Sequence, residues 1–182
     1  MIGTHDSLTY LRARWKLMEA FSFLWRTQSK TLSEQECIGA RYFDIRVRWT
    51  KQGWQVCHGL VDLRMRFGSL DEIMEMFSPH LVRLILERGD TAMFLAEISC
   101  VASLYPNLSY ACIKRGWKVL VNRDPVIKDY CFTPWLSGLS FWDNVKRLWS
   151  LRREPKTIKG WARKHRPKLD EDEETVRFVD YL

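Results

Sequence analysis

Segments typical of strands alternate with segments typical of helices along this 182-residue chain. The expected strands lie at residues 1–6, 42–48, 54–58, 93–98, 118–121 and 176–180. The expected helices lie at residues 8–28, 31–39, 69–88, 107–115 and 140–153. Two of these helices begin with a capping-box pattern, at Thr31 and at Ser69. This alternation favours an α/β fold with a parallel sheet, in a single domain that spans residues 1–182.

Side chains suited to catalysis lie at or near the carboxyl ends of separate expected strands. They are His5, Asp44, Arg46, His58, Glu97, Arg123 and Asp180. Enzymes built as (β/α)8 barrels place their catalytic groups at this end of the strands, so we expect a TIM-like (β/α)8 barrel. Six strands are expected and residues 124–168 show no clear pattern, which indicates a barrel that is shortened or partly open.

The expected strand at 42–48 alternates between an apolar face and a charged face. The apolar face carries Phe43, Ile45 and Val47, and the charged face carries Asp44, Arg46 and Arg48. In a barrel the charged face would line the mouth of the active site. Asp44 and Arg46 could equally form a structural ion pair on that face.

Three short segments share an order and a spacing that are specific to one enzyme family. They are Ile2-Gly3-Thr4-His5-Asp6-Ser7, Ala40-Arg41-Tyr42-Phe43-Asp44-Ile45-Arg46 and Cys57-His58-Gly59. Together they resemble the X-domain of phosphatidylinositol-specific phospholipase C, of the bacterial type, within the PLC-like phosphodiesterase superfamily. The resemblance is specific over residues 2–60 and looser beyond. There, the segments ending at Arg123 and Asp180 are similar to a substrate-binding position and to the last barrel strand.

The resemblance implies a role for each matched residue. It implies His5 as the general base, Asp180 as the partner of His5, and Arg46 as the group that binds the phosphoryl oxygens. It also implies His58 as the general acid with Asp6 as its partner, and Asp44 as the residue that orients Arg46 or the bases. Histidine suits acid and base work because its reference pKa lies near neutral pH.

The implied activity is that of a phosphoric diester hydrolase or lyase that cleaves phosphatidylinositol or a related glycophospholipid. Arg46 stands where calcium-dependent relatives have an acid, so we expect a mechanism without a cofactor. Glu97 is typical of the calcium-dependent relatives, and Asp6, Asp44 and Glu97 would supply the hard oxygen ligands of an alternative Ca²⁺ site. Otherwise Glu97 would contact the substrate with Arg123, or pair with Arg46 or Arg123.

The chain is basic, with 29 Lys and Arg against 22 Asp and Glu and a net charge of +7. Such a charge favours phosphate-rich partners. We expect a monomer that meets phospholipid at a membrane surface, and no nucleic acid. Two alternatives stay open: a metal-dependent glycerophosphodiester or sphingomyelin-type phosphodiesterase on the same barrel, and a non-catalytic basic module that binds lipid or nucleic acid. The second leaves the matched order of histidines and arginine unexplained.

The five cysteines include no CxxC pair, which indicates reduced thiols and a cytoplasmic location. The location is unknown if an upstream signal has been removed. No window of about 18 apolar residues is present, so we expect peripheral contact with the membrane and no transmembrane segment.

Overall fold

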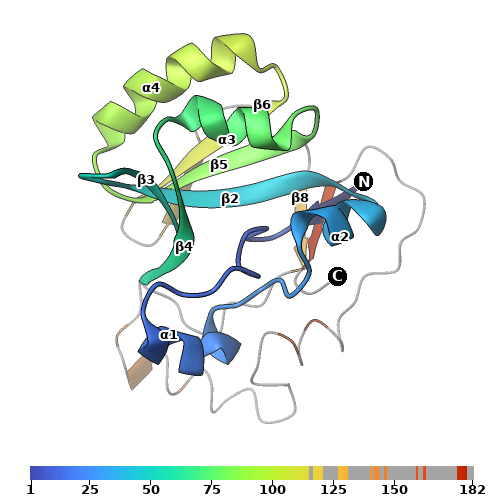
Figure 1. Cartoon of the computed structure of the whole chain (residues 1–182), viewed down its shortest axis with the longest axis vertical. Coiled ribbons are helices and arrows are strands. Elements are labelled where there is room, and N and C mark those ends of the chain that lie inside the picture. Colours follow the sequence, from blue (N-terminus) through green and yellow to red (C-terminus); the bar gives the residue numbers. More distant parts are fainter. Residues whose placement is uncertain are drawn as a thin grey trace.

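The computed structural model describes residues 1–114, 117–120, 127–130, 140, 142–143, 146, 159, 162 and 176–179. Its elements in chain order are β1 (Ile2–Thr4), α1 (Lys16–Ala20), a 3-10 turn η1 (Ser22–Leu24), α2 (Leu32–Cys37), β2 (Ala40–Thr50), β3 (Gly53–His58), β4 (Val61–Phe67), α3 (Leu70–Phe77), β5 (Leu81–Arg88), α4 (Thr91–Leu104), β6 (Leu108–Lys114), β7 (Trp117–Leu120), β8 (Ile127–Tyr130) and β9 (Val176–Val179). Figure 1 shows them coloured along the chain.

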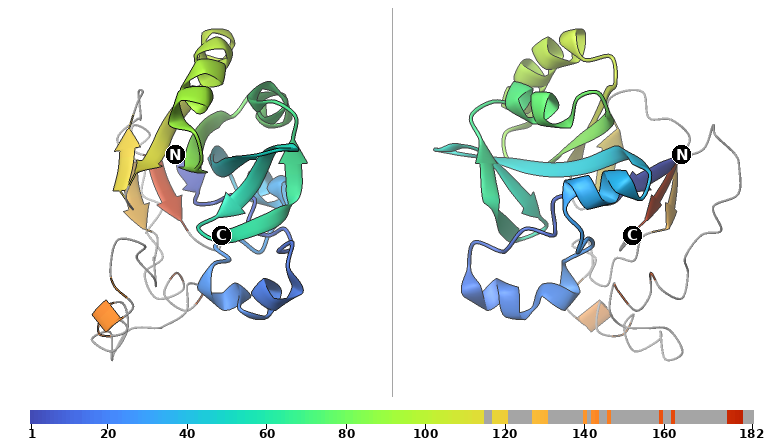
Figure 2. Two further views of the ribbon diagram at one scale, coloured as in Figure 1. Left: turned by 90° about the vertical axis from the view of Figure 1, so that its left-hand side faces the viewer. Right: turned by 45° about the vertical axis from the view of Figure 1, so that its right-hand side comes forward.

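The strands form one mixed sheet in the order β7-β6-β5-β2-β1-β9-β8, and β2 also pairs with β3, which pairs with β4. The β1–β2, β1–β9, β2–β5, β5–β6 and β8–β9 pairings are parallel, while the β2–β3, β3–β4 and β6–β7 pairings are antiparallel. The N-terminal strand β1 therefore lies beside the C-terminal strand β9 (Figure 2). The expected α/β fold is confirmed, but no pairing joins β7 to β8 among the described strands, so a closed (β/α)8 barrel is not shown.

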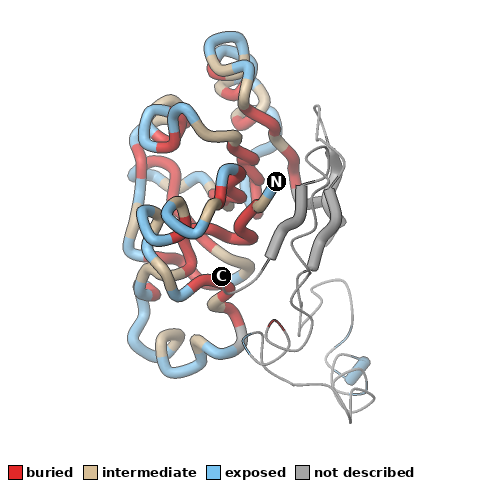
Figure 3. The backbone as a smooth tube through the Cα atoms, turned by 90° about the vertical axis from the view of Figure 1, so that its right-hand side faces the viewer, coloured by how far each residue is buried: buried red, intermediate tan, exposed pale blue. Residues whose placement is uncertain are grey.

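The core lies between the sheet and the two longer helices. α3 and α4 pack against each other, α3 also contacts β5, and α4 contacts β6 (Figure 1). Figure 3 shows buried backbone concentrated along the inner strands. Phe43, Ile45 and Val47 are all buried, so the predicted apolar face of β2 is confirmed. Consequently the opposite face of β2 is the one that carries Asp44 and Arg46.

Two polar caps fix where the short helices begin. Thr31 Oγ1 accepts a hydrogen bond from the backbone N–H of Glu34, and the Glu34 carboxylate accepts one from the backbone N–H of Thr31 at 2.7 Å. This confirms the capping box predicted for α2. Ser69 Oγ accepts from the backbone N–H of Glu72 at 3.3 Å at the start of α3, but the Glu72 carboxylate accepts from the backbone N–H of Gly68 at 2.8 Å, so only half of the capping box predicted there is formed.

The helix expected at 69–88 is wrong in its second half. α3 ends at Phe77, and residues Leu81–Arg88 form strand β5 between β2 and β6. A strand that is covered on both faces reads as a continuous apolar run, and such a run is also compatible with a buried helix. Residues Val82 to Glu87 are all buried, which explains why the alternation expected of a strand is missing.

The strand expected at 93–98 is also wrong, because these residues lie in helix α4. Asp90 caps this helix, since its Oδ1 accepts from the backbone N–H groups of Ala92 at 2.8 Å and Met93 at 3.3 Å. The buried residues Phe94 and Ile98 are spaced four apart, which suits one face of a helix. The apolar run therefore concealed a helical pattern.

Three further expectations fail in the remaining segments. The helix expected at 8–28 is reduced to the single turn of α1 and to η1. The helix expected at 107–115 is strand β6, and strand β4 at 61–67 had not been predicted. Most of the helix expected at 140–153 lies outside the described residues. No described helix is long and apolar enough to cross a bilayer.

Candidate active site

The site begins where β1 ends, at the centre of the sheet. His5 follows Thr4, the last residue of β1, and its backbone carbonyl accepts hydrogen bonds from Thr27 Oγ1 at 2.8 Å and from Gln28 Nε2 at 3.3 Å. Asp6 has a φ of 46°, a left-handed conformation that few residues other than glycine and asparagine adopt readily. Such strained backbone persists where the surroundings hold it, and it turns the Asp6 side chain toward β2 and β3.

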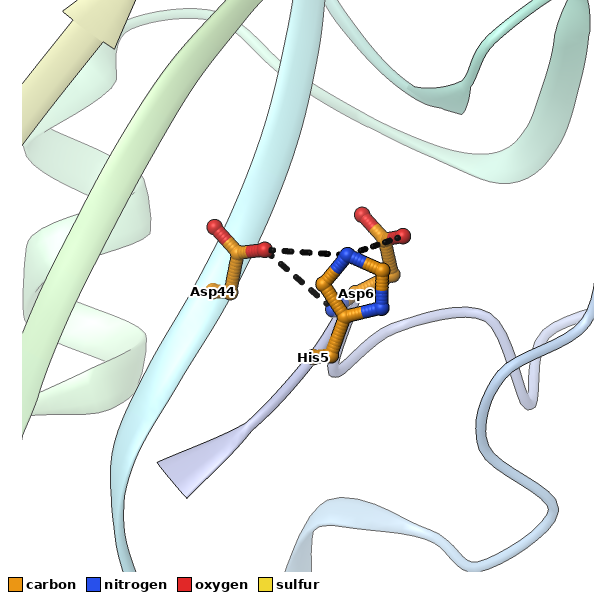
Figure 4. A group of neighbouring side chains, drawn as sticks. All are labelled: His5, Asp6 and Asp44. Atoms are coloured by element: carbon orange, nitrogen blue, oxygen red, sulfur yellow. Dashed lines mark hydrogen bonds and ion pairs between the residues drawn. The ribbon is translucent and has the colours of Figure 1, made fainter. Parts of the chain in front are cut away.

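Ser7 ties this loop to the neighbouring strand. Its backbone N–H donates to the carbonyl of Asp44 at 2.8 Å, and its Oγ accepts from the backbone N–H of Asp44 at 2.9 Å. The same hydroxyl donates to the carbonyl of Thr4 at 2.8 Å. The carboxyl end of β1 is therefore held against the middle of β2, which fixes His5 and Asp6 relative to Asp44 (Figure 4).

Asp6 lies at the centre of a cluster of charged side chains. Its Oδ2 is 2.9 Å from His58 Nε2 and 3.3 Å from His5 Nε2, and its Oδ1 pairs with Arg46 Nε. Arg46 Nη2 is in turn 2.7 Å from His5 Nε2. The two imidazole rings stand edge to face with their centroids 6.2 Å apart. One carboxylate thus organises two histidines and one guanidinium from three different segments.

The partners of each ring nitrogen assign its proton. A guanidinium N–H only donates, so the 2.7 Å contact from Arg46 suits a lone pair on His5 Nε2, while Asp6 Oδ2 lies farther from the same nitrogen, at 3.3 Å. Both nitrogens of His58 face acceptors, the carbonyl of Trp25 at Nδ1 (2.6 Å) and the Asp6 carboxylate at Nε2 (2.9 Å). These contacts suit His5 Nε2 as a proton acceptor and both ring nitrogens of His58 as proton donors.

Arg46 and the two histidines keep Asp6 ionised although it is buried. Burial raises the pKa of the Asp6 carboxyl, but the guanidinium of Arg46 and then the neighbouring imidazole rings lower it further, so the pKa lies well below its ordinary value. An ionised Asp6 can only accept hydrogen bonds. This agrees with the proton that the contacts place on His58 Nε2.

Asp44 supports the cluster from behind. It is fully buried, and its Oδ1 accepts from Arg83 Nε at 3.1 Å, while its Oδ2 lies 3.9 Å from His5 Nε2 and 3.8 Å from Arg46 Nε. Burial raises the pKa of Asp44, but Arg83 and then Arg46 lower it below its ordinary value. Asp44 and Arg83 are also direct neighbours in the β2–β5 register.

Glu87, near the end of β5, joins Arg46 to the turn after His58. Its Oε2 is 3.4 Å from Arg46 Nη1, and its Oε1 accepts from the backbone N–H of Gly59 at 2.8 Å. Gly59 has a φ of 56°, which favours glycine at this turn. Glu87 therefore fixes the position of the guanidinium relative to the strand end that carries His58.

The structure brings together five of the predicted site residues, His5, Asp6, Asp44, Arg46 and His58. Arg123 and Asp180 lie outside the described residues. The expected role of Glu97 is wrong: Glu97 lies on α4, where its carboxylate accepts from Trp54 Nε1 at 2.9 Å and from the backbone N–H of Leu70 at 2.6 Å.

Glu97 therefore joins α4 to β3 and α3 and does not reach the cluster. The alternative Ca²⁺ site built on Asp6, Asp44 and Glu97 is wrong for the same reason. His5, Asp6 and Asp44 do lie close enough to share a cation, with candidate ligand atoms within 4.8 Å of one another. Both carboxylates are, however, already paired with arginine.

Two residues of the cluster, Arg83 and Glu87, were missed from the sequence. Both lie in the segment that had been assigned to a helix. A charged side chain inside the apolar run 81–86 was the available signal, because an ionised group in a buried strand needs a partner nearby. Assigning that run to a strand would have placed Arg83 beside Asp44.

No family model matches the chain, and comparison with curated proteins gave no match. Solved structures give a match to the fold. A phosphatidylinositol-specific phospholipase C from Staphylococcus aureus aligns with a TM-score of 0.58 at 13% identity, covering 100% of this chain and 85% of that one. The enzyme of the same name from Listeria monocytogenes aligns with a TM-score of 0.53 at 14% identity, covering 100% and 87%. At this identity the similarity establishes a phospholipase-C-like fold.

Proposed function

We propose that this chain is a phosphodiesterase of the phospholipase C type, which cleaves the phosphodiester bond of phosphatidylinositol or a related glycophospholipid. The observation that carries the proposal is the arrangement of two histidines around one guanidinium, with His5 Nε2 against the donor Arg46 and both nitrogens of His58 against acceptors. A base, an acid and a fixed cation are what a phosphodiester with a neighbouring hydroxyl needs for cleavage. The similarity of the fold to bacterial enzymes of this type supports the same reaction class.

The first step uses His5 and Arg46. The phosphoryl oxygens accept a hydrogen bond from Arg46 Nη2 in place of His5 Nε2, which leaves the Nε2 lone pair of His5 able to accept a proton. His5 then accepts the proton of the inositol hydroxyl next to the phosphate, and the resulting oxygen forms a bond to phosphorus. Because the nucleophile and the phosphate belong to one molecule, the step avoids much of the entropy cost of a bimolecular attack.

The second half of the reaction uses His58. As the bond between phosphorus and the glycerol oxygen breaks, the leaving oxygen takes the proton of His58 Nε2. The contact of Nδ1 with the carbonyl of Trp25 holds the ring in place during the transfer. At the end His5 is protonated and His58 is neutral, so the net charge of the cluster is unchanged. Water can then reverse these roles to regenerate both residues.

Charge balance in the cluster suits an anionic substrate. Among the described residues, the carboxylates of Asp6, Asp44 and Glu87 face the guanidiniums of Arg46 and Arg83, and a protonated His58 balances the remaining charge. Arg46 and His58 keep 15% and 17% of their side-chain surface exposed. These are the two cations that a phosphate can reach. The negative charge that develops on phosphorus is therefore met by groups already fixed in place.

A metal-dependent phosphodiesterase is the second candidate, because His5, Asp6 and Asp44 could together hold a cation. We favour the metal-independent reaction, with no cofactor, because Arg46 and Arg83 already neutralise the two carboxylates. A divalent cation there would stand beside two guanidiniums. We further propose that the enzyme acts as a peripheral protein at a membrane surface.

The test is the release of water-soluble phosphate product from phosphatidylinositol vesicles, in EDTA and in Ca²⁺. We expect equal activity in both conditions and a loss of about 10²–10⁴-fold in His5→Ala. Activity that requires Ca²⁺ would instead favour the metal-dependent candidate. A His5→Ala variant as active as the wild type would contradict the acid–base proposal, as would an inactive wild type.

A further inference from the structure

We propose that a pocket lined by three arginines, next to an exposed apolar segment at residues 15–23, binds the phosphate of an anionic lipid and docks the protein on a bilayer. The inference rests on the proposed function for its lipid substrate, and it assigns the surface that meets the membrane. The pocket is lined by residues of β3 and β4 together with Arg14, and no lining residue belongs to the histidine cluster.

The pocket has a volume of about 210 Å³ and is lined by Arg14, Gln55, Leu63, Arg64, Met65 and Arg66. Gln55 is buried, and its Nε2 donates to the carbonyls of Val56, Leu63 and Met65 at 2.7–2.9 Å. These hydrogen bonds make the base of the pocket rigid. The three arginines are exposed around it.

Arg66 donates from Nε to Gln55 Oε1 at 3.4 Å and from Nη1 to Gln52 Oε1, so the donors offered to a ligand come mainly from Arg14 and Arg64. Arg64 uses Nε on the carbonyl of Ala13 at 3.2 Å, which leaves its two terminal amino groups to meet a ligand. No carboxylate is among the described residues that line the pocket. The two nearby acids in this part of the chain, Glu19 and Asp62, pair with Arg26 and Arg48. Guanidinium groups bind phosphate through paired hydrogen bonds, so the pocket is suited to a phosphate group.

The segment next to the pocket exposes large apolar side chains, which a helix of a soluble domain normally buries. Trp15 and Leu17 are 66% and 71% exposed, and Phe21 and Phe23 are 47% and 49% exposed. The acid of the segment, Glu19, is half-buried and paired, because its carboxylate accepts from the backbone N–H of Ala13 at 2.7 Å and contacts Arg26. A helix of a soluble domain normally buries its apolar face and exposes its acids. Large exposed apolar side chains flanked by basic ones are typical of an interfacial segment.

The pocket, the apolar segment and the catalytic cluster follow one another along the chain. Arg14 directly precedes Trp15, which begins the apolar segment, and two residues after the end of this segment the carbonyl of Trp25 contacts His58 Nδ1. Leu60, in the turn after His58, is 77% exposed. A bilayer on this face would therefore place lipid headgroups beside the histidine that we assign as the acid. Apolar and cationic groups together match an anionic lipid surface better than a nucleic acid, which offers no apolar layer.

The experiment measures the binding of the full chain to vesicles by co-sedimentation. One set of vesicles contains phosphatidylcholine alone, and the other contains phosphatidylcholine with phosphatidylglycerol. The pocket variant is Arg14→Gln with Arg64→Gln, and its control is Arg41→Gln, an exposed arginine beside α2. We expect the pocket variant to lose about fivefold in affinity for the anionic vesicles per arginine removed, equal to about 1 kcal/mol each. The control should bind like the wild type.

A second variant tests the apolar segment. Leu17→Ser removes a side chain that is 71% exposed, and Leu104→Ser at the end of α4 is its matched control, since Leu104 is 70% exposed. We expect Leu17→Ser to weaken binding to both kinds of vesicle and Leu104→Ser to weaken neither. Neither substitution removes a buried contact, so both variants should fold.

The outcomes separate this proposal from the proposed catalytic function. Phosphatidylglycerol has no inositol, so its binding does not depend on turnover. Cleavage of soluble glycerophosphoinositol should be equal in the wild type and the pocket variant. The docking proposal is overturned if the pocket variant binds anionic vesicles as the wild type does, or if the pocket binds inorganic phosphate while the chain ignores vesicles. It is also overturned if Leu17→Ser changes the oligomeric state in ultracentrifugation instead of lipid binding.

Discussion

Replacing Arg83 by Met should destabilise the protein strongly. The guanidinium is 2% exposed, and its Nε donates at 3.1 Å to the carboxylate of Asp44, which is 0% exposed. Met keeps the length and removes the charge, so Asp44 would lose the cation that most lowers its pKa. Breaking a buried ion pair from one side costs about 3–5 kcal/mol. For a chain of this size that loss corresponds to a fall of about 6–20 °C in Tm.

The assay is urea and thermal unfolding of Arg83→Met beside Arg88→Met, which removes an exposed arginine from the same strand. We expect the exposed substitution to change the free energy of unfolding by no more than about 0.5 kcal/mol. The double variant Arg83→Met with Asp44→Leu should recover part of the loss, because it leaves no unpaired buried charge, with a coupling energy of about 1–3 kcal/mol. The reasoning is refuted if Arg83→Met costs no more than Arg88→Met.

Three further predictions concern the stability of the protein at acid pH, the substitution of Gly53 and the substitution of Glu97. The free energy of unfolding should fall below about pH 4, because Asp6 and Asp44 have lowered pKa values in the folded state and their stabilising effect is lost as they gain protons. In urea titrations at a series of acid pH values, the free energy of unfolding should fall less steeply with pH in Asp44→Asn than in the wild type, and equal slopes would contradict this. Gly53→Ala should lower stability by about 2 kcal/mol, because Gly53 has a φ of 106° and an added Cβ would lie 2.3 Å from the carbonyl oxygen of Phe67; an unchanged Tm would disprove it. Glu97→Gln should cost about 1–2 kcal/mol, because an amide oxygen replaces a carboxylate that accepts from two donors; turnover should be unchanged, and a loss of Ca²⁺-dependent activity would restore Glu97 to the site.

The part of the site that could be predicted from sequence lies on β1, β2 and β3. In β2 the period of two is visible, because one face is apolar and the other carries charges. Asp44 and Arg46 therefore had to lie on one face, and the motif around His5 placed the second segment. The structure adds what no pattern contains, which is the turn of Asp6 to φ 46° that brings its carboxylate between the two rings.

The helices and strands of residues 69–114 could not be separated by pattern alone. Strand β5 is buried along most of its length, so its alternation is hidden, and helix α4 contains a run of apolar residues that resembles a strand. The decisive signal for α4 was local, since Gly89 has a φ of 132° and Asp90 caps the helix. Recognising Asp90 as an N-cap would have assigned Glu97 to the helix that follows it. The apolar run before Asp90, which contains Arg83, would then have been left as a separate strand.

The central claim is that His5 acts as the base and His58 as the acid. The most direct measurement compares His5→Ala and His58→Ala on two inositol phosphodiesters, one with a glycerol leaving group and one with para-nitrophenol, which leaves without needing a proton. The account predicts that His5→Ala loses about 10²–10⁴-fold on both substrates, whereas His58→Ala loses as much on the glycerol ester and far less on the nitrophenyl ester. Equal losses of His58→Ala on both substrates, or full activity of His5→Ala, would contradict it.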